Sequence, residues 1–135
     1  MILTAIDHVG VAAPDLEEAV AHHRRAYGAE VVHREEMAAD GVREALLQVG
    51  DSYIQLLEPT REDSPVGRFL TRNGPGLHHV GYRVTDCAAA LARLRAEGVA
   101  LIDEQPRPGS RGTTVAFVHP KDHLGTLVEL VEEPR

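Results

Sequence analysis

Two histidines of this 135-residue chain, His8 and His79, lie 71 residues apart within similar short sequences, and Gln55 and Glu129 form a second matching pair, 74 residues apart. Two imidazoles, an amide oxygen and a carboxylate are suitable ligands for a divalent first-row metal ion. A histidine in a strand is often only a buried or edge residue. However, a charged glutamate inside an apolar strand is costly to bury unless it is paired or bound to metal. The sequence therefore predicts one metal site whose ligands are His8, Gln55, His79 and Glu129.

These four residues belong to an internal repeat. The segment IDHVGVAAPDLEEAVAHHRRAYGAEVV, which starts at Ile6, matches LHHVGYRVTDCAAALARLRAEGVALI, which starts at Leu77. Further along, YIQLLEP matches LVELVEEP. Such a repeat indicates one structural unit that occurs twice. We expect a single domain over 1–135, with a first module at 1–60, a polar linker rich in proline and glycine at 61–75, and a second module at 76–135.

Each module shows the same order of elements. A short alternating strand around the histidine precedes Asp15 or Asp86, which are suitable helix N-caps, and each aspartate begins a helical stretch that ends near a glycine. Gly50-Asp51 is typical of a tight hairpin connection. The remaining expected strands are 30–34, 42–49 and 52–58 in the first module and 99–103, 113–118 and 126–131 in the second. The predicted fold is α+β, with two tandem βαβββ modules that form a curved mixed sheet around a metal-containing cleft.

One position breaks the repeat. Glu44 aligns with Val115, so an acid is present in the first module only. Glu44 shares a strand face with Leu46 and Gln48, a mixed face that is compatible with the lining of a cleft. A solvent-facing glutamate on a half-exposed strand is equally compatible with this spacing, and the sequence pattern leaves both readings open.

Composition restricts the possible partners. Apolar residues make up 43% of the chain, which is enough for a hydrophobic core, and the net charge of -7 argues against nucleic acid as a partner. We find no apolar run of about 18 residues, so we expect no membrane partner. The N-terminal sequence lacks the features of a signal peptide, and Cys87 is the only cysteine. Together these features favour a cytoplasmic protein.

Six segments of the chain resemble the methylmalonyl-CoA epimerase family of the vicinal-oxygen-chelate superfamily. They are IDHVGVA, GVREALL, YIQLLEPTREDSPVGRFL, GLHHVGYRV, DEQPRPG and FVHPKDHLGTLVELVE, and they span nearly the whole chain. The resemblance implies a glyoxalase/bleomycin-resistance-like fold. It also implies epimerisation of (2R)- and (2S)-methylmalonyl-CoA by α-proton abstraction and reprotonation through a metal-stabilised enolate.

The resemblance assigns roles to individual residues. His8, Gln55, His79 and Glu129 match the metal ligands of the family, Glu44 matches a proton-transfer base, and Glu129 matches the opposing base. It further implies one divalent ion per chain, with Co²⁺ expected and Mn²⁺, Ni²⁺ or Zn²⁺ as alternatives, and a homodimer. The turn in HPKDHLGT departs from the glycine-rich or cysteine-containing turn of relatives.

The anionic CoA tail of such a substrate requires cationic contacts. Arg107, Arg111 and Lys121 flank the final strands and are candidates for these contacts, and Ser110 is a candidate donor to the substrate carboxylate.

Three other functions share this fold or its chemistry. A glyoxalase-I-type lactoylglutathione lyase is the first alternative, but its members usually carry a glutamate at the position of Gln55. An extradiol dioxygenase would require two histidines and one carboxylate around iron, without the extra amide ligand. A drug-binding resistance protein without catalytic activity is the non-enzyme alternative. Such proteins hold flat ligands between aromatic residues, whereas aromatic residues make up 4% of this chain.

Overall fold

The computed structural model describes the whole chain, Met1 to Arg135, and the chain divides into two compact units. We call residues His8–His78 the N-terminal unit, and Met1–Asp7 together with His79–Arg135 the C-terminal unit. The boundaries therefore fall within two strands, immediately before His8 and immediately before His79.

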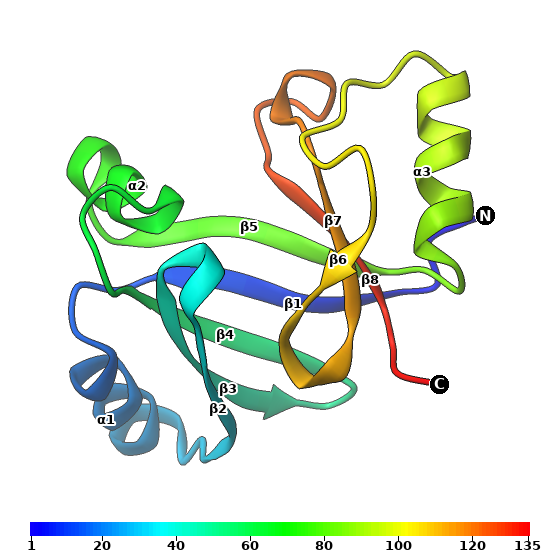
Figure 1. Ribbon diagram of the computed structural model, residues 1–135. Coiled ribbons are helices and arrows are strands. Elements are labelled where there is room, and N and C mark those ends of the chain that lie inside the picture. Colours follow the sequence, from blue (N-terminus) through cyan, green and yellow to red (C-terminus); the bar gives the residue numbers. More distant parts are fainter. The chain divides into compact units, whose positions relative to one another are not determined.

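The predicted βαβββ pattern occurs twice along the chain, which confirms the α+β fold class (Figure 1). The first set of elements is β1(Ala5–Ala12), α1(Leu16–Tyr27), β2(Val31–Met37), β3(Val42–Val49) and β4(Ser52–Pro59). The second set is β5(Gly76–Arg83), α3(Cys87–Ala96), β6(Arg107–Pro108), β7(Thr114–Val118) and β8(Val128–Glu132). The remaining elements are α2(Pro65–Asn73) and three short 3₁₀ turns, η1(Ala38–Asp40), η2(Ser110–Gly112) and η3(Pro120–Asp122).

In the N-terminal unit the strand order is β2-β3-β4-β1. The β2–β3 and β3–β4 pairs are antiparallel, and β1 pairs with β4 in parallel. Helix α1 packs on these strands through Leu16 and Val20, which meet Ala45, Leu47 and Leu56 in a buried cluster. Alternate apolar residues of β3 and β4 thus lie on the face of the sheet that helix α1 covers, as expected for an amphipathic helix on a sheet.

In the C-terminal unit the strand order is β5-β8-β7-β6. β5 pairs with β8 in parallel, and β7 pairs with β8 antiparallel. Helix α3 contributes Cys87, Ala90 and Leu91 to the buried cluster of this unit, and Ile2 and Leu3 pack against the same cluster. The first residues of the chain therefore belong to the core of the second repeat, not the first.

The strand predicted over 99–103 is wrong. Only a single bridge, between Leu101 and Val118, forms in this stretch, and the edge strand is Arg107–Pro108 instead. The side chain of Asp103 accepts a hydrogen bond from the backbone N–H of Phe117 at 2.8 Å, so a carboxylate replaces a strand carbonyl there. Side-chain bonds of this kind compete with a regular strand ladder.

The segment predicted as a linker, 61–75, contains helix α2. Ser64 accepts a hydrogen bond from the backbone N–H of Gly67 at 3.1 Å, and Pro65 occupies the first helical position. A serine N-cap followed by proline is a recognised helix-start signal. The linker prediction rested on the polar, proline and glycine content of the segment and did not take this signal into account. The division into modules at 1–60 and 76–135 stays a prediction from the repeat.

The predicted N-caps are confirmed. The side chain of Asp15 accepts from the third N–H of α1 at 3.0 Å, and Asp86 accepts from the third N–H of α3 at 2.9 Å. A second pair of caps was not anticipated: Glu58 and Glu132 accept the first N–H of α1 and of α3, at 2.9 and 2.8 Å. Glu58 and Glu132 are 74 residues apart, the spacing of Gln55 and Glu129. Each last strand thus contributes to capping the helix of its own repeat.

None of the helices is long and apolar enough to span a membrane.

Candidate metal centre

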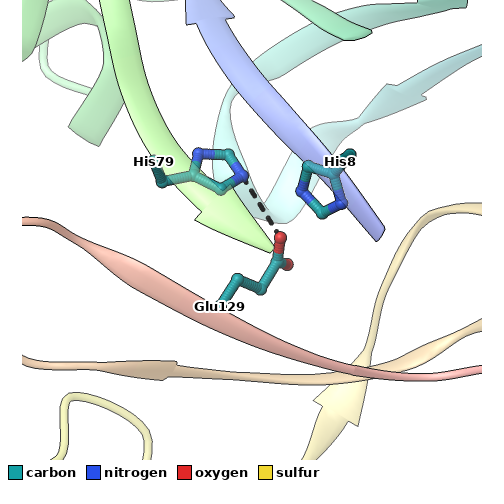
Figure 2. Close-up of side chains that lie close together, drawn as sticks. All are labelled: His8, His79 and Glu129. Atoms are coloured by element: carbon teal, nitrogen blue, oxygen red, sulfur yellow. Dashed lines mark ion pairs between the residues drawn. The ribbon is translucent and has the colours of Figure 1, made fainter. Parts of the chain in front are cut away.

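Three predicted ligands form a buried cluster. His8, His79 and Glu129 are 5%, 3% and 8% exposed, and one ligand atom from each lies within 4.8 Å of the others. Figure 2 shows the two imidazoles and the carboxylate, with Nε2 of His79 lying 3.2 Å from Oε1 of Glu129. His8 is bonded directly to Asp7, the last residue of the N-terminal segment in the C-terminal unit. This buried group is consistent with one divalent metal ion.

The β5–β8 pairing positions His79 beside Glu129. Gly81 is the register partner of Glu129, and His79 precedes Gly81 by two residues, so it points to the same face of the strand. Because Gly81 has no side chain, the imidazole and the carboxylate can meet over this position.

An aromatic ring supports the imidazole of His79. Phe117 on β7 is the register partner of Glu129, and its ring lies edge-to-face with the His79 ring at a centroid distance of 5.4 Å. The guanidinium of Arg107 lies 5.6 Å from the centre of the Phe117 ring and also pairs with Asp103 at 3.2 Å. The ring orientation of His79 is therefore restrained by its packing against Phe117, as a preorganised ligand requires.

The other two predicted functional residues meet in the N-terminal unit. Glu44 on β3 and Gln55 on β4 are 1% and 6% exposed, and Nε2 of Gln55 donates to Oε1 of Glu44 at 3.0 Å. The solvent-facing reading of Glu44 is therefore wrong. The amide oxygen of Gln55 is buried and accepts no hydrogen bond. Such an oxygen is costly to bury unless something binds it, and a metal ion is one group that would.

The structure places the four predicted substrate contacts in the C-terminal unit. Arg107 begins β6, Ser110 and Arg111 lie in η2, and Lys121 is exposed in η3. Arg111 adopts a left-handed backbone conformation with φ of 58°. The two arginines each pair with an acid of the same unit, so neither is simply an exposed surface cation.

The sequence reasoning overlooked Asp7, which is fully buried. Its two carboxylate oxygens lie 2.8 Å from Nε of Arg83 and 2.8 Å from a terminal nitrogen of Arg111. The cost of burying a charge in an apolar strand, which identified Glu129, applies equally to Asp7 in the sequence IDHVGVA. Asp7 therefore carries the same signal in the sequence as Glu129.

The other histidines do not join the cluster of His8, His79 and Glu129. The ring of His78 lies against Phe69 of α2, at a centroid distance of 5.1 Å. His33 pairs with Glu35 at 2.8 Å on the half-exposed strand β2. Adjacent side chains of a strand point to opposite faces, which accounts for this difference between His78 and His79.

Comparison with known proteins places this architecture in a known class. Residues 7–117 match the family described as the glyoxalase/bleomycin resistance protein/dioxygenase superfamily. A curated relative is the ethylmalonyl-CoA/methylmalonyl-CoA epimerase of Cereibacter sphaeroides, 40% identical over 93% of this chain and 95% of its own length.

Two solved structures are also similar. One is a methylmalonyl-CoA epimerase in complex with methylmalonyl-CoA and NH4+, with a TM-score of 0.95 and 47% identity over 97% of this chain and 95% of that chain. The other is a variant of the Streptomyces coelicolor methylmalonyl-CoA epimerase in complex with 2-nitronate-propionyl-CoA, with the same TM-score, identity and coverage. The chain therefore belongs to the methylmalonyl-CoA epimerase family within this superfamily.

Proposed function

We propose that this protein interconverts the (2R) and (2S) epimers of methylmalonyl-CoA. The observation that carries the proposal is the buried group of His8, His79 and Glu129 in a chain that is 47% identical to an epimerase solved with methylmalonyl-CoA. The buried acid Glu44 supports it, because epimerisation requires a group that accepts a proton from carbon.

The ligand set we propose is His8, Gln55, His79 and Glu129. The donors fit a divalent ion: they are two imidazoles, one carboxylate and an amide oxygen that accepts no hydrogen bond within the protein. When bound, the ion supplies Lewis-acid stabilisation of the negative charge that develops on the thioester oxygen. We expect one ion per chain, with Co²⁺ preferred over Mn²⁺, Ni²⁺ and Zn²⁺.

The protein's own acids carry the proton. The reacting carbon lies between a thioester carbonyl and a carboxylate, which makes its proton removable. Glu44 accepts this proton on one face of the carbon, and Glu129 donates a proton to the opposite face, so the configuration inverts. For the other epimer the two acids exchange roles. Burial of both carboxylates limits the access of bulk water to the intermediate.

Recognition of the rest of the substrate we assign to the C-terminal unit. Arg107, Arg111 and Lys121 supply positive charge for the anionic CoA, and Ser110 supplies a hydroxyl for the substrate carboxylate. Lys121 is the most exposed of the cations and suits a flexible phosphate contact. The expected homodimer and cytoplasmic location stay predictions from the sequence.

Proton exchange at the α-carbon tests the proposal. Methylmalonyl-CoA incubated with the protein in deuterated buffer should exchange its α-proton for deuterium and epimerise, and a chelator should abolish both effects. The Cereibacter relative is named for both ethylmalonyl-CoA and methylmalonyl-CoA, so both thioesters should be compared. If the metal-loaded protein exchanges the α-proton of neither substrate, the proposal is overturned.

A further inference from the structure

We infer that Gln55 is a positioning residue for Glu44: its amide nitrogen holds the general base in place, while its amide oxygen stays available to the metal ion. The inference rests on the proposed function, because it assumes that Glu44 receives the substrate proton. The new claim is that the reaction requires an amide at position 55, because only an amide can both donate to Glu44 and offer an oxygen to the metal ion.

The two side chains meet across adjacent strands. Leu46 is the register partner of Gln55, and Glu44 precedes Leu46 by two residues, so Glu44 and Gln55 are diagonal neighbours on one face of the β3–β4 pair. The hydrogen bond from Nε2 of Gln55 to Oε1 of Glu44 measures 3.0 Å and lies in the buried part of the sheet. A buried hydrogen bond of this length restrains both rotamers.

The chemistry of the two groups determines which way the amide points. An ionised carboxylate only accepts hydrogen bonds, so the amide must present its nitrogen to Glu44. Its oxygen then faces away, and this oxygen is buried without a hydrogen-bond partner. The Gln55 side chain therefore donates a hydrogen bond to Glu44 through its amide nitrogen and keeps its amide oxygen available as a metal ligand.

A glutamate at position 55 could perform only one of these two tasks. Its carboxylate would offer an oxygen to a metal ion, but it has no N–H to donate to Glu44. It would also place a second negative charge within about 3 Å of the first, which is strongly unfavourable in a buried site. A glutamate at position 55 would therefore keep the ligand role of this residue and lose its positioning role.

Gln55→Glu is the first test. We expect this variant to keep one metal ion per chain by elemental analysis, while kcat falls by about tenfold or more and KM changes little, because outer partners of a site typically contribute 10–100-fold. Gln48→Glu is the matched control, because it makes the same change at an exposed position of β3 and should keep full activity. Wild-type kcat in metal-loaded Gln55→Glu would overturn the inference.

Metal affinity supplies a test that does not depend on turnover. Titration of metal-free protein should give Glu44→Gln an affinity near that of the wild type, because an amide oxygen still accepts from Gln55. Glu44→Leu should bind metal about tenfold more weakly, because the buried N–H of Gln55 loses its acceptor and its oxygen is no longer oriented. Equal affinities in the two variants would overturn the inference.

The two experiments distinguish failure of the inference from failure of the proposed function. If the wild type shows no epimerisation, the function is wrong, whereas the affinity difference still reports the contact between Gln55 and Glu44. Thermal melts establish that each variant is folded. If Gln55→Glu does not fold or does not bind metal, the affinity comparison alone decides.

Discussion

The buried Asp7 forms an ion pair with the partly exposed Arg83, with 2.8 Å between Oδ1 of the carboxylate and Nε of the guanidinium. The second carboxylate oxygen pairs with Arg111 at the same distance. Asp7 immediately precedes the candidate ligand His8, and Arg83 follows His79 by four residues on β5. The ion pair therefore joins the start of β1 to the strand that carries the second imidazole.

Replacing Asp7 by asparagine should lower the free energy of unfolding by about 2–3 kcal/mol. Removing one partner of a fully buried pair costs roughly 3–5 kcal/mol, and we reduce that figure because the arginines are partly exposed. Urea denaturation measures the change. Glu62→Gln, which alters an exposed acid, is the control and should change stability by less than about 0.5 kcal/mol. An unchanged denaturation midpoint for Asp7→Asn would show that the pair contributes no net stability.

The caps of the two repeats should be energetically equivalent. Glu58→Ala and Glu132→Ala each remove the acceptor of the first N–H of a helix, and each should destabilise the protein by about 1–2 kcal/mol. Glu58→Gln retains an acceptor oxygen but loses the ion pair with Arg43. The difference in the free energy of unfolding between Glu58→Ala and Glu58→Gln therefore measures the contribution of the cap alone. If these two variants unfold at the same denaturant concentration, the ion pair and not the cap stabilises this region.

Glu44→Gln should reduce turnover by roughly a hundredfold or more, the usual contribution of a general base. Metal content and KM should stay close to wild-type values, because the amide keeps the shape of the side chain. Deuterium exchange should fall more for one epimer than for the other, since each acid serves one face of the carbon. Equal exchange from both epimers at the wild-type rate would remove Glu44 from the reaction.

His8→Ala and His79→Ala should each lose both metal and activity, and the wild type should contain about one divalent ion per chain. His78→Ala is the control, because the ring of His78 contacts Phe69 and is not part of the ligand cluster. Elemental analysis of the purified proteins measures occupancy. Full occupancy in the double variant of His8 and His79 would place the metal elsewhere.

The thiol of Cys87 should react slowly with disulfide reagents at neutral pH. Burial raises its pKa from 9.0 to about 11, with further contributions from Glu132, Asp86, Glu129 and Asp103. Because the folded pKa is raised, the protonated thiol contributes stability that is complete below pH 9.0 and is lost as the pH rises towards 11. Denaturation of wild type and Cys87→Ala across this range measures the difference. A stability gap between the two that does not change with pH would contradict the shift.

The repeated order of elements and the identity of the candidate ligands follow from the amino-acid sequence alone. Apolar periodicity and helix caps are local signals, so the strands around His8 and His79 and the N-caps Asp15 and Asp86 could be read directly. The repeat then indicated which polar residues occupy matching positions. It identified Gln55 and Glu129 because a polar group in an apolar strand needs a partner.

Which polar side chains meet depends on how distant strands pack together. The burial of Glu44 and its hydrogen bond with Gln55 depend on strand register, which spacing along the chain does not specify. The partners of Asp7 are Arg83 and Arg111, 76 and 104 residues away, so no local pattern reveals them. The strand expected over 99–103 did not form because a side chain, Asp103, occupied the backbone donor of Phe117. Local propensity selects the elements, whereas burial and hydrogen-bond partners arise only when distant segments pack together.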